Sequence, residues 1–344
     1  MSRLLFLNAE RVDWARDLDF TPLEVAMTSV QGRQALSNKD SGNRVVDAIY
    51  RPEVSAGILS PQDIAALVTP LHAVVVTKEM PVTAETIDAL PDSVKLIVEA
   101  GTGFNNIDLD AASSKNIKVC NVPAYSTDAV ASLVMTFVLS LSCSMQTTQR
   151  RWQSGDTDSW KGLGTLPHFE LAGKTIGLVG GRGAIGSRVA DLARAFGMHV
   201  LISSRSSAPC GKEGVEVVNL DDLLARSDFV SVHCPSNAET RGLIGAPQFA
   251  RMKTTAYLIN TARGNILDES ALADALKNKS IAGAGLDVMV VEPLPASSPL
   301  FQCDNVLLTP HIGWKRAETR QRLLAGVAEN IDAFFKGSPK NVVN

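Results

Sequence analysis

The sequence predicts an α/β protein with parallel, doubly wound sheets that are divided between two domains. Three observations support this prediction. Short apolar runs alternate with stretches of helical periodicity, one such unit contains a glycine-rich turn, and the length of 344 residues exceeds what a single hydrophobic core usually fills. Alternation of this kind favours parallel strands with helices on both faces of each sheet.

The first region, residues 1 to about 128, has an α/β pattern of its own. Short apolar runs at Ala73–Thr77 and Lys95–Glu99 predict strands, and Ala84–Leu90 between them predicts a helix. Residues 31–44 are polar and contain glycine and serine, which predicts a loop. We therefore expect this region to form a core of its own.

A long uncharged stretch at Ala129–Gln149 is nearly long enough to span a bilayer. Small polar residues recur in it every four positions and form one narrow helical face: Ser132, Thr136, Ser140 and Ser144. A helix with apolar flanks beside such a face is better explained by burial between packed elements. We expect a buried helix near a domain or subunit boundary, followed by an irregular segment at residues 150–170.

From Leu171 onward, strand and helix patterns alternate repeatedly. The candidate strands are Ile176–Val179, Val200–Ser203, Val215–Val218, Phe229–His233, Ala256–Asn260, Gly283–Asp287 and Val306–Leu308. This alternation predicts a doubly wound parallel sheet. A final helix at roughly Arg316–Lys336 could return to the first region.

The first strand of this series leads into a glycine-rich turn. Gly181, Gly183 and Gly186 have G-x-G-x-x-G spacing, and helical periodicity follows from Ser187. Such glycines permit a tight turn, a close approach of backbone N–H groups to a pyrophosphate, and close packing of helix on strand. The helix N-terminus adds a partial positive charge. The triplet alone also fits an ordinary loop, but its flanking strand and helix favour a dinucleotide site.

Three polar residues follow the ends of later strands: Arg263, Glu292 and His311. Each alone could be a surface arginine, a turn residue or a loop histidine. Because ligands of open α/β sheets gather at the carboxyl ends of strands, their joint occurrence favours a catalytic set. An arginine can bind a substrate carboxylate, a histidine can protonate a keto oxygen, and a carboxylate can orient the imidazole. This set suits reversible hydride transfer to a 2-keto acid.

The end of the second strand in this series bears on the choice of nucleotide. A ribose-binding acid is usual there, but this chain has Ser204, followed by Arg205 and Ser206. Hydroxyls and a guanidinium would bind a 2′-phosphate that a carboxylate would repel. We expect NADP(H) to be preferred, with NAD(H) possible; alternatively, an exposed polar strand end tolerates either nucleotide.

Composition limits the partners that we expect. The net charge is −3, no basic block suggests nucleic acid, and no basic amphipathic segment suggests a membrane surface. Five cysteines without C-x-x-C pairing indicate reduced thiols and no metal site. Acidic residues follow closely on the short apolar N-terminus, unlike a signal or transit peptide. We expect a cytoplasmic location.

Several segments resemble the D-isomer-specific 2-hydroxyacid dehydrogenase family, within it the glycerate dehydrogenase or hydroxypyruvate reductase branch. The matching segments, between about residues 74 and 325, read AGTGFNNIDLDAA, NVPAYSTDAVA, VSVHCPSNAETRGLI, INTARGNILDESALADAL, GAGLDVMVVEP and NVLLTPHIGW, together with the glycine turn. The chain departs from the family form in its VGGRGAIG turn, which is one residue longer. The resemblance implies two Rossmann-like domains, with a nucleotide domain (128–315) inserted into a substrate domain (1–127 and 316–344), and a homodimer.

The resemblance also implies roles for individual residues. Arg263, Glu292 and His311 would be catalytic, and the backbone amides of Thr102 and Gly103 would bind the substrate carboxylate. Trp314 would line the substrate pocket or pack against the last helix. The expected cofactor-binding positions are Gly181, Arg182, Gly183, Ala184, Ile185, Gly186, Ser204, Arg205, Ser206, His233, Cys234, Pro235, Thr240, Thr261, Ala262, Arg263, Asp287, His311 and Gly313.

The expected function is therefore an oxidoreductase that transfers hydride between NADP(H) and a small 2-keto or D-2-hydroxy acid. Hydroxypyruvate and glyoxylate are the favoured substrates. The alternatives are a family enzyme for another acid, such as lactate or phosphoglycerate, and a nucleotide-sensing protein of the corepressor type.

Overall fold

The computed structural model describes residues 4–7, 9–15, 17–29, 46–48, 73–156, 166–206, 208 and 211–344. The chain divides into two compact units. Unit 1 comprises Met1–Ser126 and Lys315–Asn344, and unit 2 comprises Thr127–Trp314. The polar loop expected at residues 31–44 lies outside the described residues.

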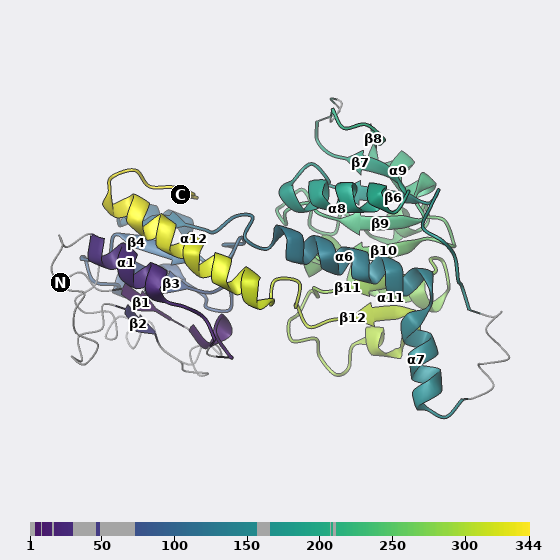
Figure 1. Ribbon diagram of the computed structural model, residues 1–344, viewed down its shortest axis with the longest axis horizontal. Helices are drawn as coiled ribbons and strands as arrows, with labels where there is room; N and C mark the ends of the chain where they lie inside the picture. The colour runs from purple at the N-terminus through teal and green to yellow at the C-terminus, as the bar shows by residue number, and fades with distance from the viewer. Residues whose placement is uncertain are drawn as a thin grey trace. The chain divides into compact units, whose positions relative to one another are not determined.

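Unit 1 contains a five-stranded parallel sheet with the order β2-β1-β3-β4-β5. Its strands are β1 (Leu4–Phe6), β2 (Val46–Ala48), β3 (Ala73–Val76), β4 (Leu96–Glu99) and β5 (Lys118–Cys120). Its helices are η1 (Ala9–Arg11), α1 (Thr21–Ser29), α4 (Ala84–Ala89), α5 (Leu109–Ser114) and α12 (Ala317–Phe335). The final helix thus returns to the first region, as predicted, and lies beside α1 (Figure 1).

Local signals explain why these helices begin where they do. Thr83 accepts a hydrogen bond from the Thr86 backbone at the start of α4, and Asp108 accepts one from Ala111 at the start of α5. Each side chain satisfies a backbone N–H that the first helical turn leaves without a partner. Strands β3 and β4 are buried along their whole length, as expected for inner strands of a parallel sheet.

Unit 2 contains a seven-stranded parallel sheet with the order β12-β11-β10-β9-β6-β7-β8. Its strands are β6 (Thr175–Val179), β7 (His199–Ser203), β8 (Val215–Val217), β9 (Phe229–Val232), β10 (Tyr257–Asn260), β11 (Gly283–Leu286) and β12 (Val306–Leu308). Its helices are α6 (Thr127–Ser142), α7 (Met145–Gln153), α8 (Ala184–Ala195), α9 (Leu220–Arg226), α10 (Ala246–Phe249), η4 (Gly264–Ile266), α11 (Glu269–Lys277) and η5 (Pro299–Gln302).

Helices cover both faces of this second sheet. Buried side chains of α6 and α8 share one apolar core, and those of α9, α10 and α11 share another. The predicted fold class, two doubly wound α/β domains with one inserted into the other, is confirmed.

The buried helix expected at residues 129–149 is present at the start of unit 2 as α6, but its predicted extent is wrong, because α6 ends at Ser142. Ser144 adopts a left-handed conformation (φ 49°), and the chain bends by 64° between α6 and α7. The apolar flanks of α6 are buried in unit 2, whereas Ser132 and Thr136 of the polar stripe are exposed, and α7 buries no residue. Residues up to Gln153 are also helical where an irregular segment was expected.

Among the described residues, no single helix is long and apolar enough to cross a bilayer, although the bent pair α6–α7 passes that test jointly.

Candidate active site

The glycine turn lies where the strand order of unit 2 reverses. Strand β6 pairs with β7 on one side and β9 on the other, so the turn after β6 opens at a topological switch point. Gly180 has a positive φ of 78°, and a Cβ there would lie 2.6 Å from the backbone nitrogen of Cys234. Only glycine permits this approach, which packs the turn against the segment that leaves β9.

The glycines of this turn differ in how closely other atoms surround them. A Cβ on Gly186 would lie 2.5 Å from the Gly181 Cα, so helix α8 can pack this closely only with glycine. A Cβ on Gly183, the residue before α8, would meet no atom within 4 Å. The N-terminus of α8 is therefore closely supported on one side and accessible on the other. This arrangement fits the pyrophosphate of a dinucleotide.

A histidine–carboxylate pair lies beyond the ends of neighbouring strands. Because β10, β11 and β12 are adjacent, their carboxyl ends bring Arg263, Glu292 and His311 to the same end of the sheet. The Glu292 Oε2 lies 2.8 Å from the His311 Nδ1, and the two side chains are 31% and 16% exposed. The Glu292 Oε1 also accepts from the Met289 backbone at 3.2 Å. Glu292 therefore orients the imidazole and favours a proton on Nδ1, which leaves Nε2 for acid–base chemistry.

Asp287 holds the loop that carries His311. It is 2% exposed, and its carboxylate accepts hydrogen bonds from Thr309 Oγ1 at 2.6 Å, Ile312 N at 2.7 Å and Gly313 N at 2.9 Å. Between these anchors His311 has a φ of 52°, a conformation that costs a non-glycine residue about 1–2 kcal/mol. The anchored loop therefore fixes the imidazole in a conformation that a free chain would rarely adopt.

Arg263 lies at the turn that follows β10. Asn260, fully buried, donates to the Arg263 carbonyl at 2.8 Å and accepts from the Ala262 N–H at 3.0 Å. A Cβ on Gly264 would lie 1.9 Å from the Met289 carbonyl carbon, so this turn packs against the segment that leads to Glu292. The Arg263 Nη1 donates to the Ala262 carbonyl at 2.7 Å. Glu292 and His311 are thus in direct contact, while the Arg263 guanidinium bonds to its own turn.

Comparison with known proteins decides the family. The model of the D-isomer specific 2-hydroxyacid dehydrogenase NAD binding domain matches residues 135–313. The chain belongs to the D-isomer specific 2-hydroxyacid dehydrogenases. A glyoxylate reductase of Korarchaeum cryptofilum is 40% identical over 268 residues, which cover 77% of this chain and 80% of that one.

One further relative and one solved structure are also similar to this chain. A hydroxypyruvate reductase of Blautia hydrogenotrophica is 34% identical over 278 residues, covering 79% of this chain and 84% of the relative. The solved structure of an acyclic imino acid reductase in complex with NADPH and D-Arg superposes with a TM-score of 0.79 at 26% identity, covering 99% of this chain and all of that one. The protein is therefore an oxidoreductase of the D-2-hydroxyacid dehydrogenase family with a domain that binds NAD(P).

Two buried polar atoms at the carboxyl ends of strands in this D-2-hydroxyacid dehydrogenase are available to hydrogen-bond a nucleotide. His233 Nε2 and Thr261 Oγ1, which follow β9 and β10, have no hydrogen-bond partner among the described residues. Burial lowers the pKa of His233 to about 4, so its ring is neutral at physiological pH. A neutral imidazole and a hydroxyl at the carboxyl ends of these two strands suit hydrogen bonding to a nucleotide. His233 is poorly suited to donate a proton in catalysis.

The remaining predicted positions lie in several loops. Thr240 Oγ1 donates to the Pro235 carbonyl at 2.6 Å and closes the loop after Cys234. Thr102 follows β4 in unit 1, where its Oγ1 donates to Val122 at 3.1 Å and its carbonyl accepts from Asn121 at 2.7 Å. Gly103 and Trp314 are half-buried.

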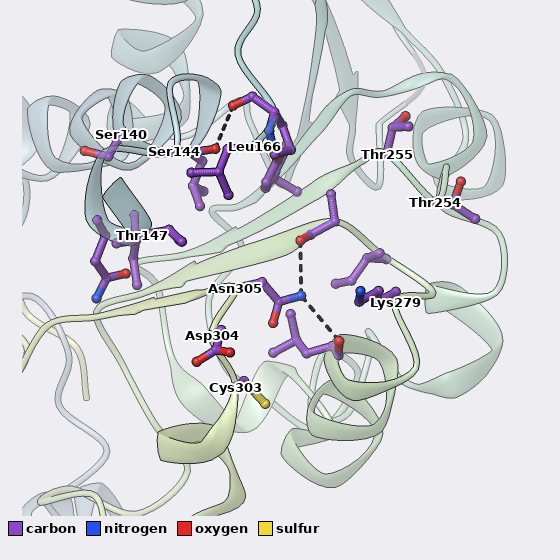
Figure 2. A pocket seen from close by; sticks show the side chains of 18 of the residues that line it. Ser140, Ser144, Thr147, Leu166, Thr254, Thr255, Lys279, Cys303, Asp304 and Asn305 are labelled. Atoms are coloured by element: carbon purple, nitrogen blue, oxygen red, sulfur yellow. Dashed lines mark hydrogen bonds between the residues drawn. The ribbon is translucent and has the colours of Figure 1, made fainter. Parts of the chain in front are cut away.

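A separate cavity of about 1050 Å³ opens at the opposite end of the unit 2 sheet (Figure 2). Its wall includes residues that precede the strands, such as Lys174, Asp228 and Asn305, whereas the glycine turn and His311 follow strands. The Asn305 Nδ2 donates to the carbonyls of Leu276 at 3.3 Å and Ala282 at 3.1 Å, and Figure 2 marks hydrogen bonds at the labelled Asn305. This cavity is therefore not the candidate active site.

Sequence reasoning missed some of the supporting residues. The apolar run predicts Asn260 only as the end of a strand, whereas its buried amide shapes the Arg263 turn. The one sequence signal of this role is an amide residue at the end of an apolar run. The hydrogen bonds of Asp287 to the His311 loop were also missed, because they join residues on two different strand exits.

Proposed function

We propose that the protein is a reductase of small 2-keto acids that prefers NADP(H), with glyoxylate or hydroxypyruvate as its substrate. The observation that carries this proposal is the Glu292–His311 pair, 2.8 Å apart, at the same sheet end as Arg263 and the glycine turn. Relatives named for reduction of glyoxylate and of hydroxypyruvate support the choice of substrate. Unit 2 would bind the nucleotide, and unit 1 would contribute to substrate binding.

Each residue has a distinct task in the proposed reaction. The Arg263 guanidinium binds the substrate carboxylate and aligns the keto group. The backbone amides of Thr102 and Gly103 in unit 1 are further proposed substrate-binding groups. When bound, the reduced nicotinamide supplies the hydride that adds to the keto carbon. The His311 Nε2 donates its proton to the keto oxygen, which becomes the hydroxyl of the product. Glu292 stabilises the imidazolium before this transfer and orients the neutral ring after it.

Other assignments belong to the same proposal. Asp287, besides holding the His311 loop, lies at a strand end where it could contact the nicotinamide amide. Trp314 would line the substrate pocket. We further propose a cytoplasmic homodimer.

A panel of keto acids tests the proposed substrate. We expect kcat/KM for glyoxylate and hydroxypyruvate to exceed that for pyruvate and for phosphohydroxypyruvate by roughly tenfold or more, since one extra or missing group in a fitted pocket changes kcat/KM by about 10- to 200-fold. Initial rates with both reduced nicotinamides would be measured for each acid. Faster turnover of pyruvate or phosphohydroxypyruvate would assign the enzyme to a different acid.

We infer the preference for NADP(H) from Ser204, which lies directly after β7 where the dinucleotide fingerprint usually has an acid. Ser204→Asp should lower kcat/KM for NADPH by roughly 10- to 100-fold, because the new carboxylate would repel the 2′-phosphate. It should leave kcat/KM for NADH unchanged or raise it, since a carboxylate can bind the ribose hydroxyls.

The matched control is Ser338→Asp, which adds the same charge at an exposed position of unit 1. This variant should retain the cofactor ratio of the wild type. A wild-type enzyme that clearly prefers NADH, or a Ser204→Asp variant that still prefers NADPH, would contradict the proposed preference.

A further inference from the structure

The glycine turn carries an arginine that reaches the end of the neighbouring strand. The Arg182 Nε donates to the Ser204 Oγ at 2.8 Å, and its Nη2 donates to the Ala208 carbonyl. Ser204 is the first residue after β7, and its hydroxyl donates in turn to the Ser206 carbonyl at 2.7 Å. These bonds hold a guanidinium between the turn after β6 and the segment that leaves β7.

Arg182 differs from its neighbours in its ion pairing. Arg188, one turn into α8, forms an ion pair in which its Nε lies 2.8 Å from the Asp128 Oδ1. The Arg205 Nη1 lies 4.0 Å from the Glu239 Oε2. No carboxylate among the described residues pairs with Arg182. Within the described part of the chain, only neutral oxygens contact the Arg182 guanidinium, so an anion bound there would displace none of the described acidic side chains.

The two arginines near Ser204 also differ in how well they are positioned. The Arg205 side chain is 90% exposed, whereas Arg182 is half-buried and held by two hydrogen bonds. An exposed side chain loses more rotamer freedom when it binds a ligand, and a guanidinium that is already oriented loses less. A planar guanidinium beside a hydroxyl also matches the donor geometry that phosphate oxygens prefer.

We propose that Arg182 is the principal determinant of specificity for a 2′-phosphorylated adenosine ribose, with Ser204 as its hydroxyl partner and Arg205 in a minor role. This inference rests on the proposed preference for NADP(H) and assigns that preference mainly to the glycine turn. The Arg182 guanidinium keeps the bonds to the Ser204 hydroxyl and the Ala208 carbonyl that orient it, and it donates its remaining N–H groups to phosphate oxygens. The Ser204 hydroxyl, whose proton is held by the Ser206 carbonyl, turns from that carbonyl to donate to the same phosphate.

Binding of nucleotide fragments tests this assignment without involving the keto acid. Calorimetry would give Kd for 2′,5′-ADP and 5′-ADP with the wild type, Arg182→Ala, Arg182→Gln and Arg205→Ala. We expect both Arg182 variants to bind 2′,5′-ADP roughly 10- to 100-fold more weakly, with Kd for 5′-ADP changed by less than about threefold. Arg205→Ala should raise Kd for 2′,5′-ADP by less than about fivefold, because the Arg205 side chain is exposed.

Arg188→Ala is the matched control, since it removes an arginine of the same helix region that already pairs with Asp128. It should bind both fragments as the wild type does. Arg182→Gln retains a donor for Ser204 without the charge, so it separates the charge from local packing.

The outcomes separate the two proposals. If the wild type prefers 2′,5′-ADP and only Arg205→Ala abolishes that preference, the role of Arg182 is overturned while the NADP(H) preference stands. If the wild type binds both fragments equally, the NADP(H) preference fails, and the role of Arg182 fails with it. A specific loss in both Arg182 variants supports the assignment.

Discussion

Replacing His311 by alanine should lower kcat for keto-acid reduction by roughly 10²- to 10⁴-fold, which is the usual contribution of a positioned general acid. The expected loss follows from the contact between His311 Nδ1 and Glu292 Oε2, because this contact leaves Nε2 as the proton donor. The affinity for the nucleotide should change little, because the glycine turn follows β6 whereas His311 follows β12. Steady-state rates and calorimetric Kd values for the nucleotide would be measured in parallel.

His199→Ala is a suitable control, because His199 is an exposed histidine at the start of β7, the end of that strand opposite Ser204. It should retain wild-type turnover. Near-normal reduction by His311→Ala, with intact folding, would show that another group donates the proton.

Replacing Arg263 by alanine should lower kcat/KM by roughly 10²- to 10³-fold, because a charge-assisted, bidentate contact with the substrate carboxylate would be lost. Arg263→Lys should recover only part of this loss, since an ammonium lacks the planar fork of the guanidinium. Initial rates over a range of keto-acid concentrations would separate KM from kcat.

Arg226→Ala provides the comparison for loss of an arginine from unit 2, because Arg226 forms an exposed pair with Glu216. It should behave as the wild type does in the assay. Unchanged KM and kcat in Arg263→Ala would remove Arg263 from the proposed mechanism.

Much of unit 2 could be predicted because its strands are short apolar runs that polar residues follow in the sequence. Arg263, Glu292 and His311 follow separate apolar runs, and parallel strands necessarily present such exits at one end of the sheet. That β10, β11 and β12 are adjacent is a fact of tertiary structure, as is the 2.8 Å contact between Glu292 and His311.

Other features depend on contacts that periodicity does not encode. The break between α6 and α7 depends on the left-handed conformation of Ser144, within a stretch whose composition alone favours a continuous helix. The bond between Arg182 and Ser204 joins two loops that are 22 residues apart. Local sequence patterns predict that each loop binds a nucleotide, but they do not predict the hydrogen bond that joins the two loops.

The most direct test of the proposed function is the oxidation of NADPH by the wild-type protein with glyoxylate or hydroxypyruvate. We expect oxidation that depends on the keto acid and yields one D-2-hydroxy acid per NADPH consumed. Binding of NADPH without consumption in the presence of any keto acid of the panel would contradict a reductase and would favour a protein that senses the nucleotide.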